Sequence, residues 1–404
     1  MASAASQAIP RTSRKPVQRV DTITAQFDLP LLIAVFTLLA FGLIMVGSAS
    51  IAIADKELGQ PFYYLIRQAI YVCLGVGIAS AIVFIPLYMW ERFSALLFIS
   101  GILLLVVVLV PGISQSINGS TRWLSLGIIN LQPSEFMKLF VIVYLAGYLV
   151  RRGEEVRTRV LGFLKPMLIL MLIATLLLME PDLGAAAVMF ATALGMMFLG
   201  GVRLWQFGVL LMMVLSAIAI LTITSPYRLE RVTAFLNPWA DPFNSGFQLT
   251  QSLIAFGRGE WFGLGLGSSI QKLFYLPEAH TDFVFAVLAE ETGLFGSVLV
   301  VSLFAFIAWR AFKIANKAQY LGLHFAAYIA FGITLWLCMQ AFINIGVNMG
   351  VLPTKGLTLP LMSYGGSSML ASCMAIALLL RVDIETRIAW LSFAGVKSER
   401  GARR

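Results

Sequence analysis

Carboxylates that could act as a base gather in LPEAHTDFVFAVLAEETG, residues 276–293. Thr281 or Asp282 can cap a helix that begins there, which would place Asp282 where outside water meets the membrane that this apolar chain must cross. A carboxylate in such a semi-enclosed place can have a raised pKa and act as a general base. A plain N-cap aspartate fits the spacing equally well, so both roles stay open.

Glu290 and Glu291 follow on the same helix, roughly 12–13 Å farther along its axis. They fit an internal hydrogen-bonded pair that positions helices. A helix from Thr281 to Arg310 would have about 30 residues, more than one membrane crossing needs. We therefore expect its outer part to project into a loop-covered cavity, or the helix to break near Gly293.

A cation and a carboxylate share a helix face at the end of NGSTRWLSLGIINLQPSEFMK, residues 118–138. Glu135 and Lys138 are neighbours on a helix because they are three positions apart. An unpaired ammonium within a span would be costly, so Glu135 is the expected partner of Lys138, in a cavity that faces water. Substrate contact and a purely stabilising pair remain alternatives. Arg122 could bind phosphate or anchor its loop at the lipid headgroups.

Two carboxylates occupy the turn MEPDLG, residues 179–184. Asp182 is expected to cap the helix that follows. The sharper alternative is contact with substrate or with a divalent cation, Mg²⁺ or Mn²⁺, held near Glu180 and Asp182.

A fourth polar segment, NMGVLPTKGLTLPLMSYGGSS, covers residues 348–368. Lys355 and the exposed amides beside it could hold an anion such as pyrophosphate. Ser363 and the two glycines after it open the last span, where small residues allow close helix packing.

Several kinds of site are absent from the sequence. It contains no Walker motif, no HExxH, no G-x-S-x-G and only two histidines, which argues against metal hydrolysis and serine triads. Cys73, Cys338 and Cys373 all fall inside apolar runs and are expected to be packing residues without disulfides or zinc. No organic cofactor is expected. Scattered carboxylates and cations around an outer cavity suit a polar, anionic, lipid-linked substrate.

The elements that position these residues must be membrane-spanning helices. Of the 404 residues, 59% are hydrophobic and 12% charged, whereas soluble domains carry about 25% charged residues. Backbone groups in the bilayer core find partners only within helices or closed barrels. We expect an all-α integral membrane protein with about ten spans, at residues 31–51, 70–85, 94–110, 136–150, 163–179, 184–201, 204–224, 294–312, 321–345 and 361–382.

Lys and Arg predict the orientation of the spans. Most of the 29 basic residues fall on one side of the ten-span arrangement, which marks the cytoplasmic face. Both termini are therefore expected in the cytoplasm, with tails at residues 1–25 and 386–404 around a membrane domain at 26–385. No cleaved signal peptide is expected. The net charge of +9 is a topology signal and does not indicate nucleic-acid binding.

A large extracytoplasmic loop, residues 225–280, joins spans seven and eight, and a loop of this length is typically functional. Its segment at residues 247–256 is expected to form a short helix at the interface. Trp239 and Trp261 suit the headgroup level. The glycines between residues 257 and 267 are expected to make the following stretch flexible.

Five motifs resemble those of a known family. GSTRWLSLG, LQPSEFMK, EPDLG, LPEAHTDFVFAVLAEE and LPTKGLTLPLMSYGGSS are similar to the motifs of the SEDS peptidoglycan polymerases (shape, elongation, division and sporulation). The resemblance covers residues 25–390. PEAHTDF and PTKGLTLP are more similar to the division member of the family than to the elongation member.

The resemblance implies an activity that composition cannot show. Members polymerise lipid II, an undecaprenyl-pyrophosphate-linked disaccharide-pentapeptide, into glycan strands outside the cytoplasmic membrane. The aspartate of the TDF motif, here Asp282, is the family's proposed catalytic residue. Lys355, Lys138, Arg258 or a divalent cation would stabilise the pyrophosphate leaving group. The candidate substrate-binding residues are Glu135, Lys138, Asp182, Arg122, Arg258, Lys355 and Ser363.

The same resemblance implies partners and a place. Members of the family act with a class B penicillin-binding transpeptidase, and the division member also acts with other septal proteins at the inner membrane of bacteria. Two alternatives would use the same features. One is a lipid II flippase, and the other is a non-catalytic scaffold that only recruits the transpeptidase.

Overall fold

The computed structural model describes residues 27–112, 114–117, 120–125, 130–224, 233, 235–244 and 246–402. The tail predicted at residues 1–25 and the start of the predicted outer loop, residues 225–232, lie outside this part of the chain.

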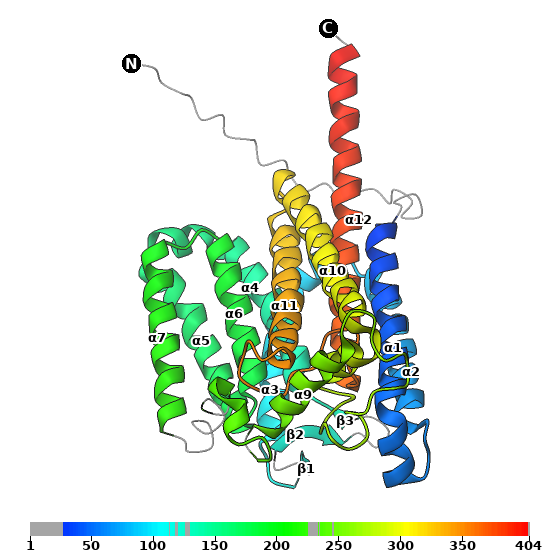
Figure 1. Cartoon of the computed structure of the whole chain (residues 1–404). Helices are drawn as coiled ribbons and strands as arrows, with labels where there is room; N and C mark the ends of the chain where they lie inside the picture. Colours follow the sequence, from blue (N-terminus) through cyan, green and yellow to red (C-terminus); the bar gives the residue numbers. More distant parts are fainter. Residues whose placement is uncertain are drawn as a thin grey trace.

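Helices overlap all ten predicted segments in the described residues (Figure 1). Eight of them are long and apolar enough to cross a membrane, and α6 is a shorter apolar helix. The chain is thus a multi-pass helical membrane protein. The helices are α1 (Leu29–Leu58), α2 (Tyr63–Val83), α3 (Leu87–Val108), α4 (Pro133–Thr158), α5 (Val160–Met179), α6 (Leu183–Leu199), α7 (Leu204–Ile223), α10 (Val284–Tyr320), α11 (His324–Asn348) and α12 (Gly366–Ala402).

Some helix ends differ from the predictions. α2 begins seven residues earlier than predicted, at Tyr63. α12 begins at Gly366 instead of residue 361, because the Pro- and Gly-containing segment before it stays irregular. α12 then continues to Ala402, so most of the predicted C-terminal tail is helical.

Local signals define the ends of α1. The Asp28 side chain accepts a hydrogen bond from the Leu31 amide at 3.1 Å, and Pro30 lies in the first turn. Both are favoured at a helix start. Gly59 ends the helix in the left-handed conformation, with φ 65°, which glycine adopts without strain.

The outer end contains smaller elements. Strands β1 (Ser114–Ile117), β2 (Ser120–Ser125) and β3 (Asn130–Leu131) form an antiparallel sheet in the order β1-β2-β3. This sheet was not predicted, because strands this short carry little periodic signal. A 3-10 turn, η1 (Pro238–Ala240), precedes α9 (Phe247–Gly259), which confirms the predicted short helix.

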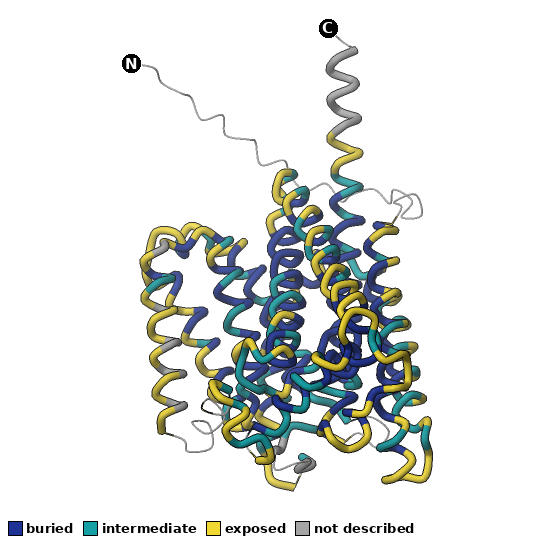
Figure 2. The backbone as a smooth tube through the Cα atoms, viewed as in Figure 1, coloured by how far each residue is buried: buried dark blue, intermediate teal, exposed yellow. Residues whose placement is uncertain are grey.

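The centre of the bundle is formed by α4, α11 and α12, which are mostly buried (Figure 2), while α2 and α3 face outward over much of their length. Trp336 of α11 is the largest fully buried side chain in the described residues. α7 lies at the edge of the bundle, beside α6 (Figure 1). The segments that carry the candidate site therefore rest on the most closely packed helices.

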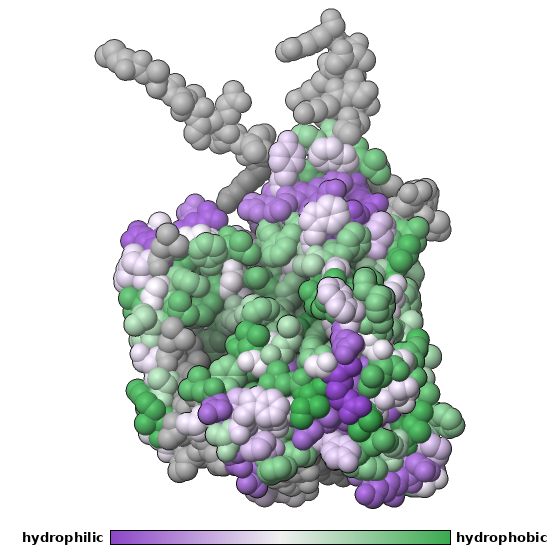
Figure 3. Space-filling view, viewed as in Figure 1, coloured by the Kyte–Doolittle hydropathy of each residue, from purple (hydrophilic) through white to green (hydrophobic). Residues whose placement is uncertain are grey.

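Hydrophilic residues gather towards the two ends of the molecule, with an apolar band between them (Figure 3). At one end, Arg310 of α10 and Arg387 of α12 both lie beside the Asp28 carboxylate at the start of α1. The other end holds the sheet and α9 (Figure 1). This basic end is the one predicted to be cytoplasmic, and that assignment stays a prediction.

α10 is broken at Gly293, which has φ 66° and ψ −161°, and this confirms the predicted break. The loop after α9 forms hydrogen bonds with backbone groups of α10 that the break leaves without helical partners. The Leu294 amide donates to the Glu260 carbonyl at 2.9 Å. A Cβ on Gly263 would lie 2.2 Å from the Glu291 carbonyl oxygen, so only glycine fits there. Gly263 thus packs against the break, while the flexibility predicted for this glycine-rich stretch stays a prediction.

Candidate active site

Asp282 lies in the turn before α10. The prediction that Thr281 or Asp282 caps this helix is wrong. The N-cap position belongs to Phe283, whose side chain makes no capping hydrogen bond. Asn348 of α11 supplies the cap instead, because its Oδ1 accepts from the Ala286 amide at 3.1 Å. The Asp282 carboxylate is therefore left for other chemistry.

The surroundings of Asp282 favour its neutral form. Burial raises its pKa to about 7. That value includes the negative charges of Glu278 and Asp182, which also raise the pKa, and Arg122, which lowers it. The residue keeps partial exposure, so protons can exchange with outside water. A carboxyl with a pKa near 7 suits a general base at neutral pH.

The segment at residues 353–363 forms a wall beside Asp282. A Cβ on Gly356 would lie 3.1 Å from Asp282 Oδ2, so the carboxylate abuts the main chain of the segment. Lys355, a predicted anion-binding residue, is half-buried next to Gly356. Ser363 is buried, and its Oγ accepts from the Leu359 amide at 2.8 Å. Its hydroxyl thus supports the backbone of the wall.

Lys138 and Glu135 form the predicted ion pair on α4, with 2.8 Å between Nζ and Oε1. Both side chains are buried. Lys138 Nζ also donates to Gln340 Oε1 at 2.7 Å. Gln340 Nε2 in turn donates to the Thr358 carbonyl at 3.0 Å. The pair is confirmed, and one amide of α11 connects it to the wall beside Asp282.

Asp182 caps α6 as predicted, because its Oδ1 accepts from the Ala185 amide at 3.0 Å. Its Oδ2 accepts from the Ser134 hydroxyl at 3.2 Å and from Gln132 Nε2 at 3.3 Å. Both carboxylate oxygens are thus engaged with protein donors, and they join α6 to the start of α4.

Arg122 reaches from β2 to the turn between α5 and α6. Its Nε donates to the Glu180 carbonyl at 2.9 Å, and a terminal nitrogen donates to the Pro181 carbonyl at 2.5 Å. Arg122 therefore anchors its loop to this turn.

The Glu180 carboxylate is fully buried, and neither oxygen has a hydrogen-bond partner among the described residues. Burial raises its pKa to about 8, and the negative charge of Asp182 adds to the shift, while Arg122 opposes it. In the described part of the chain, no group of three or more His, Cys, Asp and Glu could hold a metal.

Glu290 and Glu291 are buried at the break of α10, and each has its own cation. Arg258 Nε lies 3.3 Å from Glu290 Oε1, and Lys272 Nζ lies 2.8 Å from Glu291 Oε1. The structure therefore ties Arg258 to the break and does not bring it to the Asp282 carboxylate.

Two groups were missed in the sequence analysis. The first is a set of buried amides on one face of α11, Gln340, Asn344 and Asn348. Their regular spacing of four was a readable signal, because amides inside an apolar helix are costly unless they find partners. The second group is aromatic, with the His280 ring centre 4.6 Å from that of Tyr64 and 5.5 Å from that of Tyr364.

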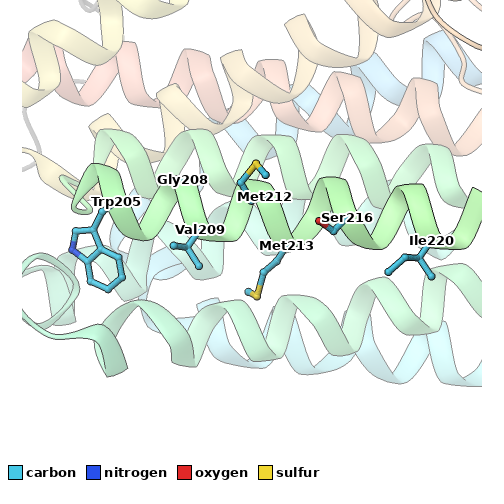
Figure 4. A pocket seen from close by; sticks show the side chains of 7 residues that line it. All are labelled: Trp205, Gly208, Val209, Met212, Met213, Ser216 and Ile220. Atoms are coloured by element: carbon cyan, nitrogen blue, oxygen red, sulfur yellow. The ribbon is translucent and has the colours of Figure 1, made fainter.

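A separate apolar hollow of about 660 Å³ runs along α7 (Figure 4). Among the described residues, its lining holds no ionisable side chain that could serve acid–base chemistry. The lining residues are Trp205, Gly208, Val209, Met212, Met213, Ser216 and Ile220.

Residues 29–388 match the model of a family described as cell cycle protein, FtsW/RodA/SpoVE. The chain belongs to this family. Among FtsW/RodA/SpoVE relatives, a probable peptidoglycan glycosyltransferase FtsW from Thioalkalivibrio sulfidiphilus is 58% identical over 377 residues, covering 93% of this chain and 94% of the relative. The corresponding protein of Coxiella burnetii is 53% identical over 370 residues, covering 92% and 100%. The predicted similarity to the division member is thereby confirmed.

Solved structures of the FtsW/RodA/SpoVE type share the fold. A chain from a peptidoglycan synthase complex that coordinates polymerization and crosslinking aligns with a TM-score of 0.72 at 31% identity, covering 89% of this chain and 98% of that chain. The rod shape determining protein RodA of Thermus thermophilus aligns with a TM-score of 0.66 at 29% identity, covering 88% and 96%.

Proposed function

We propose that this chain is a peptidoglycan glycosyltransferase that polymerises lipid II into septal glycan strands, with Asp282 as the general base. The relatives at 58% and 53% identity bear the name of this activity. The observation that carries the assignment of the base is a partly exposed carboxylate, released from helix capping, with its pKa raised to about 7.

In the proposed step, the 4-hydroxyl of the acceptor GlcNAc attacks the anomeric carbon of the donor MurNAc. Asp282 takes the hydroxyl proton as the new glycosidic bond forms. The bond from the anomeric carbon to the pyrophosphate oxygen breaks, and undecaprenyl pyrophosphate leaves with the electron pair. Because this leaving group is already activated, no strong acid is needed.

The departing pyrophosphate gains negative charge that must be stabilised. Lys355 is the first candidate, because it adjoins Gly356 in the wall beside Asp282. Lys138 and Arg258 remain candidates but are engaged in ion pairs.

A divalent cation, Mg²⁺ or Mn²⁺, is a further proposal, and it would neutralise charge on the leaving group. Glu180 would hold it, because neither of its oxygens has a partner in the described residues. Mg²⁺ is commonly bound through one or two carboxylates together with substrate phosphates, so a full protein cage is not needed. Glu180→Gln should weaken binding of Mn²⁺ measured by electron paramagnetic resonance, and unchanged binding would exclude Glu180 as the ligand.

We further propose a class B penicillin-binding transpeptidase and other division proteins as partners at the septum of the inner membrane. The similarity to a chain of a peptidoglycan synthase complex supports a partner that crosslinks what this chain polymerises.

Polymerisation of labelled lipid II tests the proposal directly. The full chain, purified with its transpeptidase, should form glycan strands, and Asp282→Ala should abolish them while the complex stays assembled. Strand formation at the normal rate by Asp282→Ala would overturn the assignment of the base. Transfer of lipid II between leaflets by the pure protein, without polymerisation, would favour the flippase. Growth of cells that carry only Asp282→Ala would favour the scaffold.

A further inference from the structure

Three buried amide side chains follow one face of α11. We call Gln340, Asn344 and Asn348 the amide stripe, and each has an exposed fraction of 2% or less. Residues four apart lie above one another on a helix. The stripe meets two segments that are distant in sequence, the turn with Asp282 and the wall at residues 353–363.

Asn348 performs the capping that the sequence of α10 does not supply. Its Oδ1 accepts from the Ala286 amide at 3.1 Å, and its Nδ2 donates to the Asp282 carbonyl at 3.0 Å. The first amides of a helix need acceptors, which a short polar side chain just before the helix normally provides. Because Asn348 fills this role, the Asp282 side chain does not have to fold back onto the helix.

Asn344 joins the two sides of the site. Its Nδ2 donates to the Asp282 carbonyl at 2.8 Å and to the Leu357 carbonyl at 2.5 Å. Leu357 follows Gly356, whose backbone abuts the Asp282 carboxylate. One amide thus holds the main chain on both sides of the group proposed to react.

We infer that Asn344 and Asn348 are positioning residues for Asp282, which fix its main chain against the wall and leave its carboxylate free of capping. The inference rests on the proposed function, because it concerns the geometry of the proposed base. Displacing a reacting group by about 1 Å can cost about 100-fold in rate. Two amide hydrogen bonds to one carbonyl oxygen restrain such a displacement.

Charged groups reach Asp282 from several neighbouring elements. Glu278 belongs to the same turn, Asp182 begins α6, and Arg122 extends from β2. Lys355 lies in the wall next to Gly356. By contrast, α11 has no acidic or basic residue after His324 at its first position, so the stripe orients Asp282 without adding charge.

Two substitutions separate positioning from simple support. Asn344→Leu keeps a similar size but removes both donated hydrogen bonds. Asn348→Asp has the same shape and keeps the acceptor for the Ala286 amide, but it loses the donor to Asp282. Asn316→Leu, at an exposed site near the end of α10, is the matched control. Each is measured as the full chain with its transpeptidase, for lipid II polymerisation and for thermal unfolding.

We expect kcat to fall about 10- to 100-fold in both variants, with KM for lipid II changed by less than about twofold. The acid limb of the pH–rate profile should move in opposite directions in the two variants. In Asn344→Leu the loosened turn admits water and the limb moves to lower pH. In Asn348→Asp the added negative charge moves it to higher pH. A merely structural role would leave the limb of Asn344→Leu unshifted, whereas the shift in Asn348→Asp reports only the added charge near Asp282.

Two results would overturn the inference. One is a kcat within about twofold of the wild type in both variants, with normal thermal unfolding. The other is loss of the folded complex in both variants, which would make the stripe a structural support. Asp282→Asn in the same series separates this inference from the proposed function. If Asp282→Asn is inactive while both stripe variants are fully active, only the positioning fails. If Asp282→Asn is active, the proposed base fails as well.

Discussion

Asp282 and Glu290 belong to the same sequence motif and differ in what the fold has done with them. Glu290 is fully buried and accepts from Arg258, the Ser269 hydroxyl and the Gln271 amide. Asp282 is partly exposed, and the amides of α11 hold its main chain. The Glu290 carboxylate is engaged in structural hydrogen bonds, whereas the Asp282 carboxylate remains available to a substrate.

The difference teaches how to separate structural from reactive carboxylates in a membrane protein. Both carboxylates lie at or near a predicted membrane span, where an ionisable group invites a functional hypothesis. Hydrogen-bond saturation separates them, because a carboxylate with every lone pair engaged has no capacity left for a substrate proton.

The largest expected effect tests the reactive side of the comparison. Asp282→Asn should lower the polymerisation rate by about 10²–10⁴-fold, as expected for loss of a general base. Thermal unfolding should be unchanged, because the carboxylate does not cap α10. Asp55→Asn, at an exposed position in α1, is the control for loss of a carboxylate. A marked loss of stability in Asp282→Asn would contradict the comparison.

Glu291, like its neighbour Glu290, is a buried carboxylate with a structural role, and removing its partner cation tests that role. Lys272→Met should destabilise the protein by about 3–5 kcal/mol, because a buried charge would lose its partner. The rate per folded molecule should fall far less than in Asp282→Asn. Thermal unfolding and polymerisation are measured together, with Lys165→Met at an exposed site as the control. Equal stability of the two lysine variants would show that this ion pair does not hold the break.

The pH dependence of the rate sharpens the comparison further. The pKa of Asp282 lies at about 7, and the base must be deprotonated to accept a proton. The rate should therefore rise with pH through about 7, and at one pH unit below the pKa roughly a tenth of the maximum should remain. The residual rate of Asp282→Asn should lack this limb. A wild-type rate that falls as pH rises from 6 to 8 would refute the role of Asp282 as base.

The smallest effect concerns the cap itself. Thr281→Ala should change stability by less than about 0.5 kcal/mol, because Asn348 supplies the cap of α10. Asp28→Ala removes a side-chain cap from α1. It should lower the free energy of unfolding by about 0.5–2 kcal/mol, as is typical of a lost cap, or by more. Comparable losses in the two variants would mean that Thr281 does cap α10.

Composition and charge predicted the part of the fold that depends on the bilayer. The ten apolar segments became helices because the membrane leaves their backbone no other partner. The break at Gly293 was predictable because the helix was too long for one span. The pair of Glu135 and Lys138 was predictable from local spacing.

What the sequence analysis did not predict depends on contacts between segments far apart in sequence. The cap of α10 comes from Asn348, 62 residues beyond Ala286, where no local rule would place it. The glycines after α9 looked flexible, yet Gly263 packs against Glu291 of α10. Arg258 stays a candidate for the substrate, but no local rule predicted its ion pair with Glu290.

The pairing between the broken helix and its loop has a mechanical consequence. The Glu260 carbonyl bonds to Leu294 after the break, whereas the backbone bond at Glu291 and the ion pair of Lys272 with Glu291 hold the loop to the part of α10 before it. Any displacement of the loop drags the short outer helix, and that helix carries the Asp282 turn at its tip. Because the loop bonds to α10 on both sides of Gly293, it splints the break and restrains the Asp282 turn.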